Sequence, residues 1–413
     1  MPQNKQPKLV RISEKLQQNM QYVDELMGLE TNFDIIHRVI RLGDTDACMY
    51  LIDGFCKDEL MQKILQYLMD LKAEDFPKDA HEMSKIAIPY VEVDLDDTWE
   101  KILGALLSGV FVLLLDGYEK AVLIDARTYP ARGVEEPDKD KVLRGSKDGF
   151  VETVVFNTAL IRRRIRSTDL HMEMLNAGEN SRTDIVLCYM ESRVDPKLLT
   201  QIRERIRSIQ VDALAMNQES LAECLYQRKW YNPFPKFKYT ERPDTAAAQV
   251  LEGNLVILVD NSPSAMILPT TIFDVVEEAD DYYFPPVTGT YLRLTRFLIA
   301  LLTYFVTPTY LLLMNHRMWI PENLEFIILK EDPNVPLILQ FLLLELAIDG
   351  LRLAAVNTPN MLSTPLSVMA ALVLGEFSVE SGWFSSEVML AMAFVAIANY
   401  TQANYCLLYT SPS

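Results

Sequence analysis

Three ionisable residues stand at helical spacing inside an apolar stretch near the C-terminal end of the chain. Residues 335–356 read VPLILQFLLLELAIDGLRLAAV and contain Glu345, Asp349 and Arg352. Their spacing places them on one stripe of an α-helix. An ionisable side chain at membrane depth is costly and usually faces protein or a water-filled path. The stripe therefore has three interpretations: a lining of an ion pathway with Arg352 as partner or gate, a structural ion pair between packed helices, or a helix lying at the membrane interface.

The stretch before it predicts a membrane span. Residues 297–314 read FLIALLTYFVTPTYLLLM, without a charge, and with their flanks approach the roughly 20 residues needed to cross a bilayer. Pro308 predicts a kink, which membrane helices tolerate. Arg293 and Arg296 precede the stretch, so the positive-inside rule places its N-terminal end in the cytoplasm and the loop 315–332 across the membrane. Two shorter apolar runs, 366–374 and 388–398, bring the expected number of membrane helices to at least two and as many as four.

The region before Pro286 mixes charged and apolar residues in short blocks and predicts a soluble α/β region with two lobes. The expected organisation is a polar segment over 1–30, lobes over 31–130 and 131–290, and a helical membrane domain over 291–405. The first lobe is expected to contain a small mixed sheet. Strands are predicted over 47–55, 109–115, 121–125, 183–191, 255–259 and 265–268, and helices over 57–71, 97–107, 150–166, 196–209 and 218–227. Asp116-Gly117 and Asp260-Asn261 indicate hairpin turns.

Motifs for catalysis are missing from the sequence. It has no phosphate-binding loop GxxxxGK[ST], no GxSxG and no HExxH, and its four histidines are far apart. The five cysteines form no CxxC pair and no metal-ligand spacing, which suits a reducing compartment. We therefore expect no enzyme activity, no cofactor and no metal. The formal net charge of −18 also argues against nucleic acid as a partner, because binding it requires a basic surface.

The densest basic run is Arg162-Arg163-Arg164, followed by Arg166. It lies in an apolar-periodic segment, so one interpretation is a solvated helix face, and the other is a contact with a second subunit or with anionic lipid head groups. Arg242 lies between Glu241 and Asp244. We expect it to pin the segment that joins the helices of the second lobe to its last hairpin.

Several blocks, in this order, resemble the GerA family of spore germination proteins, the A-type membrane subunit. They are residues 134–137 (VEEP), 143–145 (LRG), 149–152 (GFVE), 157–165 (NTALIRRRI), 232–235 (NPFP), 240–244 (TERPD), 251–253 (LEG), 268–271 (LPTT) and 280–283 (DDYY). Residues 359–405 look more like the SpoVAF branch of that family. The charged motif residues to which we assign structural roles are Glu135, Glu136, Arg144, Arg162, Arg163, Arg164, Glu241, Arg242 and Asp244.

The resemblance implies a multi-pass protein of the spore inner membrane with its soluble lobes in the cytoplasm. It also implies a ring-shaped homo-oligomer that conducts ions beside a second germination membrane subunit. The family pattern continues past Tyr405, whereas residues 406–413 (CLLYTSPS) resemble nothing in it, so we expect a truncated chain with a non-native tail. Another function remains open: a membrane-anchored signalling or scaffold protein that acts through its soluble lobes.

Overall fold

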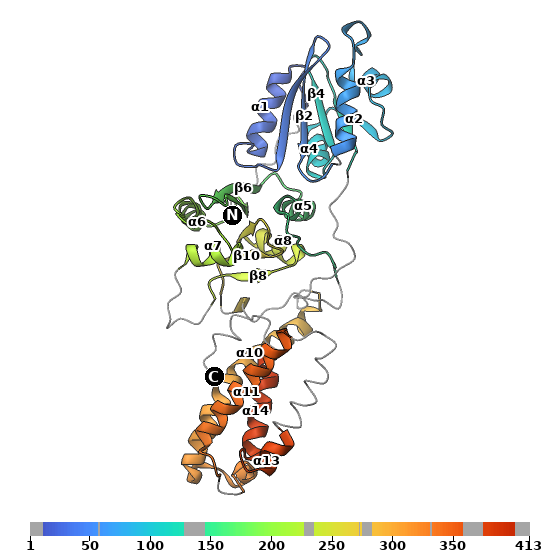
Figure 1. The fold of residues 1–413 in the computed structure, drawn as a ribbon. Helices are drawn as coiled ribbons and strands as arrows, with labels where there is room; N and C mark the ends of the chain where they lie inside the picture. The colour runs from blue at the N-terminus through green and yellow to red at the C-terminus, as the bar shows by residue number, and fades with distance from the viewer. Residues whose placement is uncertain are drawn as a thin grey trace. The chain divides into compact units, whose positions relative to one another are not determined.

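The structure is a computed structural model that describes residues 11–56, 58–127, 145–226, 235–271, 273–274, 283–330, 333–357 and 375–400 (Figure 1). The chain divides into two compact units. The first unit holds the described residues from 11 to 270, apart from Pro235. The second holds Pro235 and the described residues from Thr271 onward.

The first lobe of the first unit contains a five-stranded sheet. Its strands are β1 (Ile35–Leu42), β2 (Thr45–Ile52), β3 (Val93–Asp96), β4 (Phe111–Leu115) and β5 (Ala121–Ile124). They lie in the order β1-β2-β4-β5-β3, and every pairing is antiparallel. The expected mixed sheet is therefore wrong. Helical connections carry the chain from β2 to the far edge and back to the centre, so strands of the same sense never become neighbours.

Helices cover both faces of this sheet (Figure 1). α1 (Leu16–Met27) and α4 (Trp99–Leu107) pack on one face, and the predicted polar segment 1–30 thus contributes a helix to this lobe. α2 (Asp58–Met69), the short 3-10 turn η1 (Ala73–Asp75) and α3 (Ala80–Ile86) follow β2, and α2 and α3 pack on the other face. The helices predicted over 57–71 and 97–107 are confirmed.

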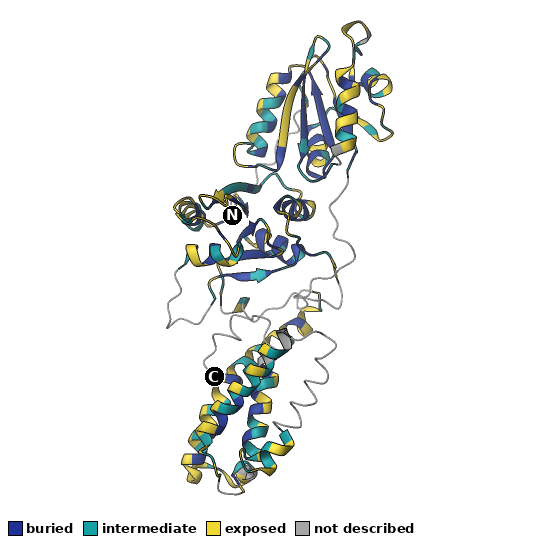
Figure 2. Ribbon diagram, in the orientation of Figure 1, coloured by how far each residue is buried: buried dark blue, intermediate teal, exposed yellow. Residues whose placement is uncertain are grey.

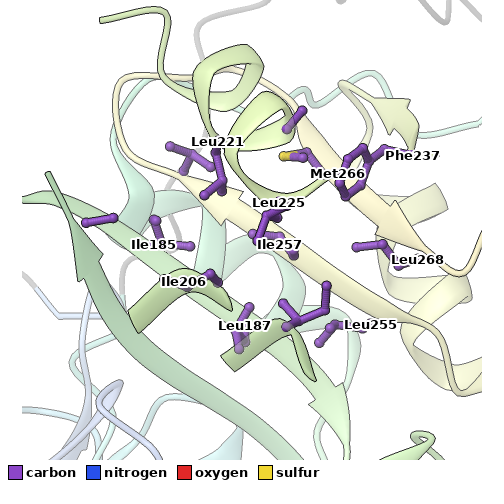
Figure 3. Close-up of a cluster of buried hydrophobic side chains, with 14 of the residues drawn as sticks. Ile185, Leu187, Ile206, Leu221, Leu225, Phe237, Leu255, Ile257, Met266 and Leu268 are labelled. Carbon is purple, nitrogen blue, oxygen red and sulfur yellow. The ribbon is translucent and has the colours of Figure 1, made fainter. Parts of the chain in front are cut away.

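The second lobe repeats this plan with a second antiparallel sheet. Its strands are β6 (Leu170–Ala177), β7 (Thr183–Met190), β8 (Lys238–Thr240), β9 (Leu255–Val259) and β10 (Ala265–Leu268), in the order β6-β7-β9-β10-β8. α5 (Val154–Arg164) and α8 (Pro243–Glu252) pack on one face. α6 (Pro196–Arg207) and α7 (Gln218–Leu225) pack on the other, over the buried cluster drawn in Figure 3.

Both predicted hairpins are present. β4 pairs with β5 across the Asp116-Gly117 turn, where Gly117 has a φ of 83°. β9 pairs with β10 across a turn in which Asn261 has a φ of 59°. Asparagine is one of the few residues other than glycine that adopt this left-handed conformation readily. The short sequence signals therefore placed both turns correctly.

The second unit is helical. It consists of α10 (Pro286–Asn315), the 3-10 turns η3 (Arg317–Trp319) and η4 (Glu322–Ile327), α11 (Leu337–Asn357), α13 (Ser378–Glu380) and α14 (Ser386–Tyr400). α10, α11 and α14 share one small apolar cluster that includes Tyr310, Phe341 and Val388. Much of the remaining apolar surface of the three helices is exposed (Figure 2). Such a surface is typical of helices that contact lipid or further helices.

Among the described residues, one helix, α10, is long and apolar enough to cross a membrane. Each stretch of α11 that has the length of a span includes all three of its ionisable residues, and α14 has only 15 residues. The apolar run 366–374 lies outside the described residues. The expectation of two to four membrane helices is thus supported for α10 and stays a proposal for the others.

Candidate functional site

The acidic stripe of α11 lies between a packed face and an exposed face of the helix. Phe341 and Leu344 are buried against α10 and α14, whereas Leu342 and Leu346 are 57% and 69% exposed. At about 100° per residue, Glu345 and Asp349 project from the flank between these faces. Both are half-buried. Arg352 follows Asp349 by three residues in the same helix.

The position of Glu345 and Asp349 at the flank of α11 limits what can surround their carboxylates. A carboxylate in the packed centre of the three helices would need a partner there, and one in the centre of the exposed apolar face would meet lipid. The flank allows Glu345 and Asp349 to line a boundary that another helix or another subunit completes, with water between them. The two carboxylates therefore lie on a part of α11 that a further helix can cover with polar groups.

α10 is longer than a bilayer requires. Its 30 residues span about 45 Å, against about 30 Å for the hydrocarbon core. Its charge-free residues 297–314 lie toward the C-terminal end, and its N-terminal end carries Arg293, which is exposed, and Tyr291, which is 65% exposed. Arginine and tyrosine are typical of the level of the lipid head groups. Thr303 donates to the carbonyl of Ile299 at 2.9 Å, which satisfies its hydroxyl within the apolar part of the helix.

Arg162 forms a buried ion pair that joins the two lobes of the first unit. Its Nε donates to Asp34 Oδ2 at 2.8 Å and its Nη2 donates to Asp34 Oδ1 at 3.0 Å. The side chains are 0% and 2% exposed. Nη1 also donates to the carbonyls of Ser167 and Leu170, at 3.3 and 3.1 Å. The interpretation of the basic run as a solvated helix face is therefore wrong for Arg162, because docking of the first lobe covers this face of α5.

Further contacts surround this ion pair, and together they form the lobe junction. Asn32 accepts from the backbone N–H of Met172 at 2.6 Å and donates to the carbonyl of Met27 at 2.6 Å. The Oγ1 of Thr31 and the Nδ1 of His171 are 2.8 Å apart. Ile52 and Phe55 of the first lobe share a buried cluster with Ala159 of α5. Polar and apolar contacts thus fix the two lobes against each other.

His171 has a lowered pKa at this junction. Burial is the main cause, and the charge of Arg162 adds to it, while nearby carboxylates oppose the shift. The imidazole also stacks on Tyr189, with ring centroids 5.7 Å apart. A neutral His171 is therefore the form that fits the docked lobes, since protonation would place a cation in a partly buried contact.

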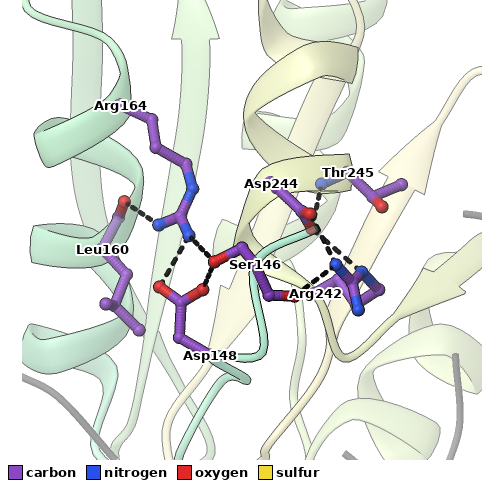
Figure 4. Close-up of polar contacts among 7 residues, drawn as sticks. All are labelled: Ser146, Asp148, Leu160, Arg164, Arg242, Asp244 and Thr245. Carbon is purple, nitrogen blue, oxygen red and sulfur yellow. Dashed lines mark hydrogen bonds and ion pairs between the residues drawn. The ribbon is translucent and has the colours of Figure 1, made fainter. Parts of the chain in front are cut away.

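Arg164 and Arg242 fix the segment 145–150 by a network drawn in Figure 4. Arg164 donates to Asp148 Oδ2 at 2.6 Å and to Ser146 Oγ at 3.1 Å. The buried Arg242 donates to Asp244 Oδ2 at 2.6 Å and to the carbonyl of Ser146 at 2.7 Å. The backbone N–H of Phe150 adds a bond to the carbonyl of Glu241 at 2.8 Å. The two arginines thereby hold the start of the second lobe against α5 and α8.

The other charged motif residues do not share the buried contacts of Arg162 and Arg242. Arg163 is exposed on α5, next to the buried Arg162. Glu135, Glu136 and Arg144 lie outside the described residues. Asp34, Asn32, Ser146 and Asp148 belong to these polar contacts but were not singled out from the sequence. No local signal marks them, because each partner of Asp34 and Asn32 in the second lobe is more than 100 residues away.

Possible metal ligands and buried thiols are the described groups that bear on the absence of a metal-binding spacing in the sequence. Within the described ranges, no group of three or more His, Cys, Asp or Glu residues is placed to hold a metal ion. Burial raises the pKa of the Cys48 thiol to about 12 and also raises that of Cys188. A thiol with a raised pKa is a poor nucleophile near neutral pH. Cys48 and Cys188 therefore act as small packing side chains in the buried clusters of the two lobes.

Comparison with known proteins gives one family over nearly the whole chain. The family model described as Bacillus/Clostridium GerA spore germination protein matches residues 21–411. This range covers both compact units and includes residues 406–411, part of the tail for which we expected no family resemblance.

Individual relatives agree with the family model. Stage V sporulation protein AF of Bacillus subtilis (strain 168) is 38% identical over 407 residues, which are 98% of this chain and 82% of that protein. Spore germination protein A1 of the same strain is 30% identical over 383 residues, 92% of this chain and 78% of that protein. A crystal structure of the N-terminal domain of the A subunit of the Bacillus megaterium spore germinant receptor GerK3 is similar with a TM-score of 0.50. Its identity is 27%, and the match covers 64% of this chain and 98% of that one.

Proposed function

The chain belongs to the GerA family of spore germination proteins, and on that premise we propose that it is a membrane subunit of an oligomeric ion-conducting complex. In this proposal the first unit is the cytoplasmic part and the helices of the second unit form part of the path. The chain has no catalytic role in the complex. Its relatives carry the names of germination and sporulation proteins, and none of the names given above is that of an enzyme.

The observation that carries the proposal is the position of Glu345 and Asp349 on α11. A helix that only anchors a soluble domain has no use for two carboxylates and an arginine on one stripe, since each is costly at membrane depth. On the flank of the helix, half-buried and beside an exposed apolar face, the stripe suits a cation path that is closed by neighbouring subunits. Rings of acidic side chains attract cations in this way.

The proposal also names the partner subunits of the chain and the membrane in which the complex lies. A homo-oligomeric ring would present each carboxylate once per subunit, which multiplies its effect on passing ions. A second germination membrane subunit would act beside the ring, and the lipid bilayer would cover the exposed apolar surfaces of α10 and α11. We assign the complex to the spore inner membrane because the chain belongs to a family of spore germination proteins. Arg293 and Arg296, just before the charge-free residues 297–314 of α10, support a cytoplasmic position of the first unit.

Ion flux from liposomes tests this proposal. The full-length protein is purified, reconstituted, and compared with empty liposomes for release of K⁺ and Na⁺ under an imposed gradient. The proposal predicts release that depends on the protein and favours cations over anions. Protein that assembles and inserts correctly but passes no ion, alone or with its second subunit, would support the scaffold function instead.

A further inference from the structure

The outer strands of the first sheet, β1 and β3, carry unlike charges. Directly after β3, Arg11 forms a β-bridge with Thr98, and the N–H of Ile12 donates to the carbonyl of Asp97 at 2.9 Å; no other described residue pairs with the outer side of β3. β1 pairs with β2 along all eight of its residues, and no described strand lies on its other side. Ile36 and Val39 of β1 are 38% and 52% exposed, and the four residues 36–39 are all exposed. A strand edge of this length without a partner strand is a template for pairing with another strand.

The charges of the two edges are complementary. β1 carries Arg38 and Arg41 and no acidic residue, whereas β3 carries Asp94 and Asp96 and follows Glu92. Arg41 and Asp94 are exposed, and no ion pair joins either to another described residue. Asp96 is already engaged by Thr98 and Lys101, so Asp94 is the carboxylate available to a partner.

The strand directions of the sheet also fit a head-to-tail contact. Four antiparallel steps separate β1 from β3, so the two edge strands run in the same sense. A rotation about an axis along the strands keeps this sense and brings β1 of one copy beside β3 of the next in parallel. Pairing of β1 with β1 would instead bring four arginines together without an acidic side chain, which like-charge repulsion disfavours.

One register satisfies the side chains of both edges. When Val39 lies beside Asp94, the exposed Ile36 lies level with Val91, which precedes β3 by two residues and is 97% exposed. Arg41 then lies diagonally across from Asp94, on the same face of the sheet. The faces agree because Val39 is paired with Cys48, and Asp94 with Leu123, whose side chains belong to the same buried cluster.

We propose that a second copy of this chain docks here, with its β1 added in parallel to β3, so that one sheet continues from subunit to subunit around the assembly. The inference rests on the oligomer of the proposed function and names its cytoplasmic contact. A contact over four residues of β3 is small compared with a stable interface, so it forms when the membrane helices hold the copies close together. A repeated head-to-tail contact of this kind closes into a ring when the rotation permits.

Cysteine cross-linking of the full chain in membranes tests the contact. In a background with Cys56, Cys224 and Cys406 changed to serine, Ile36→Cys and Val91→Cys are combined and oxidised. Adjacent strands lie about 4.8 Å apart, which is within disulfide reach. We expect a ladder of covalent oligomers. Differently tagged Ile36→Cys and Val91→Cys copies should form mixed dimers, while Ile36→Cys alone should form none.

Three further variants separate docking from folding. Ile36→Cys with Met216→Cys is the matched control, since Met216 is exposed in the second lobe between α6 and α7, and it should give no ladder. Arg41→Glu should lower the yield about fivefold, as expected when one exposed ion pair becomes a repulsion, and Asp94→Lys in the same chain should restore it. A folding defect would not be restored in this way.

The results separate a failure of the β1–β3 contact from a failure of the proposed oligomer. Oligomers seen by light scattering in detergent without the cross-link between positions 36 and 91 would overturn the β1–β3 contact and leave the proposed function standing. A chain that stays monomeric in membranes would contradict both. A cross-link of Ile36→Cys to itself would show symmetric pairing of β1 and would refute the head-to-tail arrangement.

Discussion

Replacement of Asp34 by asparagine should loosen the lobe junction. The variant keeps the shape of the side chain but removes the charge that faces the Arg162 guanidinium. Arg162 is 0% exposed and keeps three neutral acceptors, the carbonyls of Ser167 and Leu170 at 3.3 and 3.1 Å and the amide oxygen of the new side chain, while the amide NH2 faces the guanidinium as a second donor. Loss of one partner of a buried ion pair typically costs about 3–5 kcal/mol. Since a domain has a total stability of about 5–15 kcal/mol, this loss is large.

Hydrogen–deuterium exchange of the full chain in detergent measures this effect where it arises. We expect faster exchange in the peptides that contain Asn32 and the end of α5, and a smaller change in β9 and β10, which lie away from the junction. Asp46→Asn is the matched control, because Asp46 is an exposed aspartate in β2 and should change stability by less than about 0.5 kcal/mol.

A double variant shows whether the loss comes from the stranded charge. Asp34→Leu with Arg162→Met removes both charges and fills the site with apolar atoms, so it should cost less than the sum of the two single variants. The reasoning would be refuted by unchanged exchange in Asp34→Asn, or by a double variant whose cost equals that sum.

Three other predictions concern the rest of the molecule. Arg242→Ala should lower the stability of the first unit by about 3 kcal/mol, because it leaves Asp244 and the Ser146 carbonyl without their partner; unchanged thermal unfolding with lost germination would assign Arg242 to a functional contact instead. Burial alone would raise the pKa of Asp96, but hydrogen bonds from its neighbours outweigh it and hold the pKa at about 2. Asp96 should therefore contribute about 2 kcal/mol above pH 4, lost as the pH falls from about 4 to 2, and Asp96→Ala should abolish this part of the pH dependence in urea titrations. A cysteine placed in the loop 315–332 should react with a membrane-impermeant reagent added outside the cell, and protection there would reverse the assigned topology.

Local signals in the sequence were sufficient for most helices and for both hairpins. The strands that were missed are β1, β3, β6 and β8, and three of them show why. β1 reads IIHRVIRL and lies at an edge, where exposure on both faces removes the alternation of apolar and polar residues. β3 has four residues, and β6 reads LHMEMLNA, whose leucine, methionine and alanine also favour helices. Their pairing depends on neighbours that are distant in the sequence.

In the candidate sites, too, contacts within one helix were predictable from the sequence, and contacts between distant segments were not. The spacing of Glu345, Asp349 and Arg352 was enough to place them on one stripe of α11. The interpretation of Arg162 as part of a solvated face was wrong because its partner, Asp34, lies in another lobe and 128 residues away, although its assigned structural role agrees with the buried ion pair. A helix face that looks solvated in the sequence becomes buried when a second lobe docks on it, and no pattern within the helix records that event.

Cation flux through a Glu345→Gln protein tests the central claim most directly. The substitution keeps size and hydrogen bonding but removes one negative charge per subunit from the proposed path. Glu322→Gln is the matched control, since Glu322 is exposed in the connection between α10 and α11. We predict a Glu345→Gln protein that assembles normally and passes fewer cations than both the wild type and the Glu322→Gln control in liposomes. Wild-type flux from well-assembled Glu345→Gln protein would contradict the assignment of this stripe to the ion path.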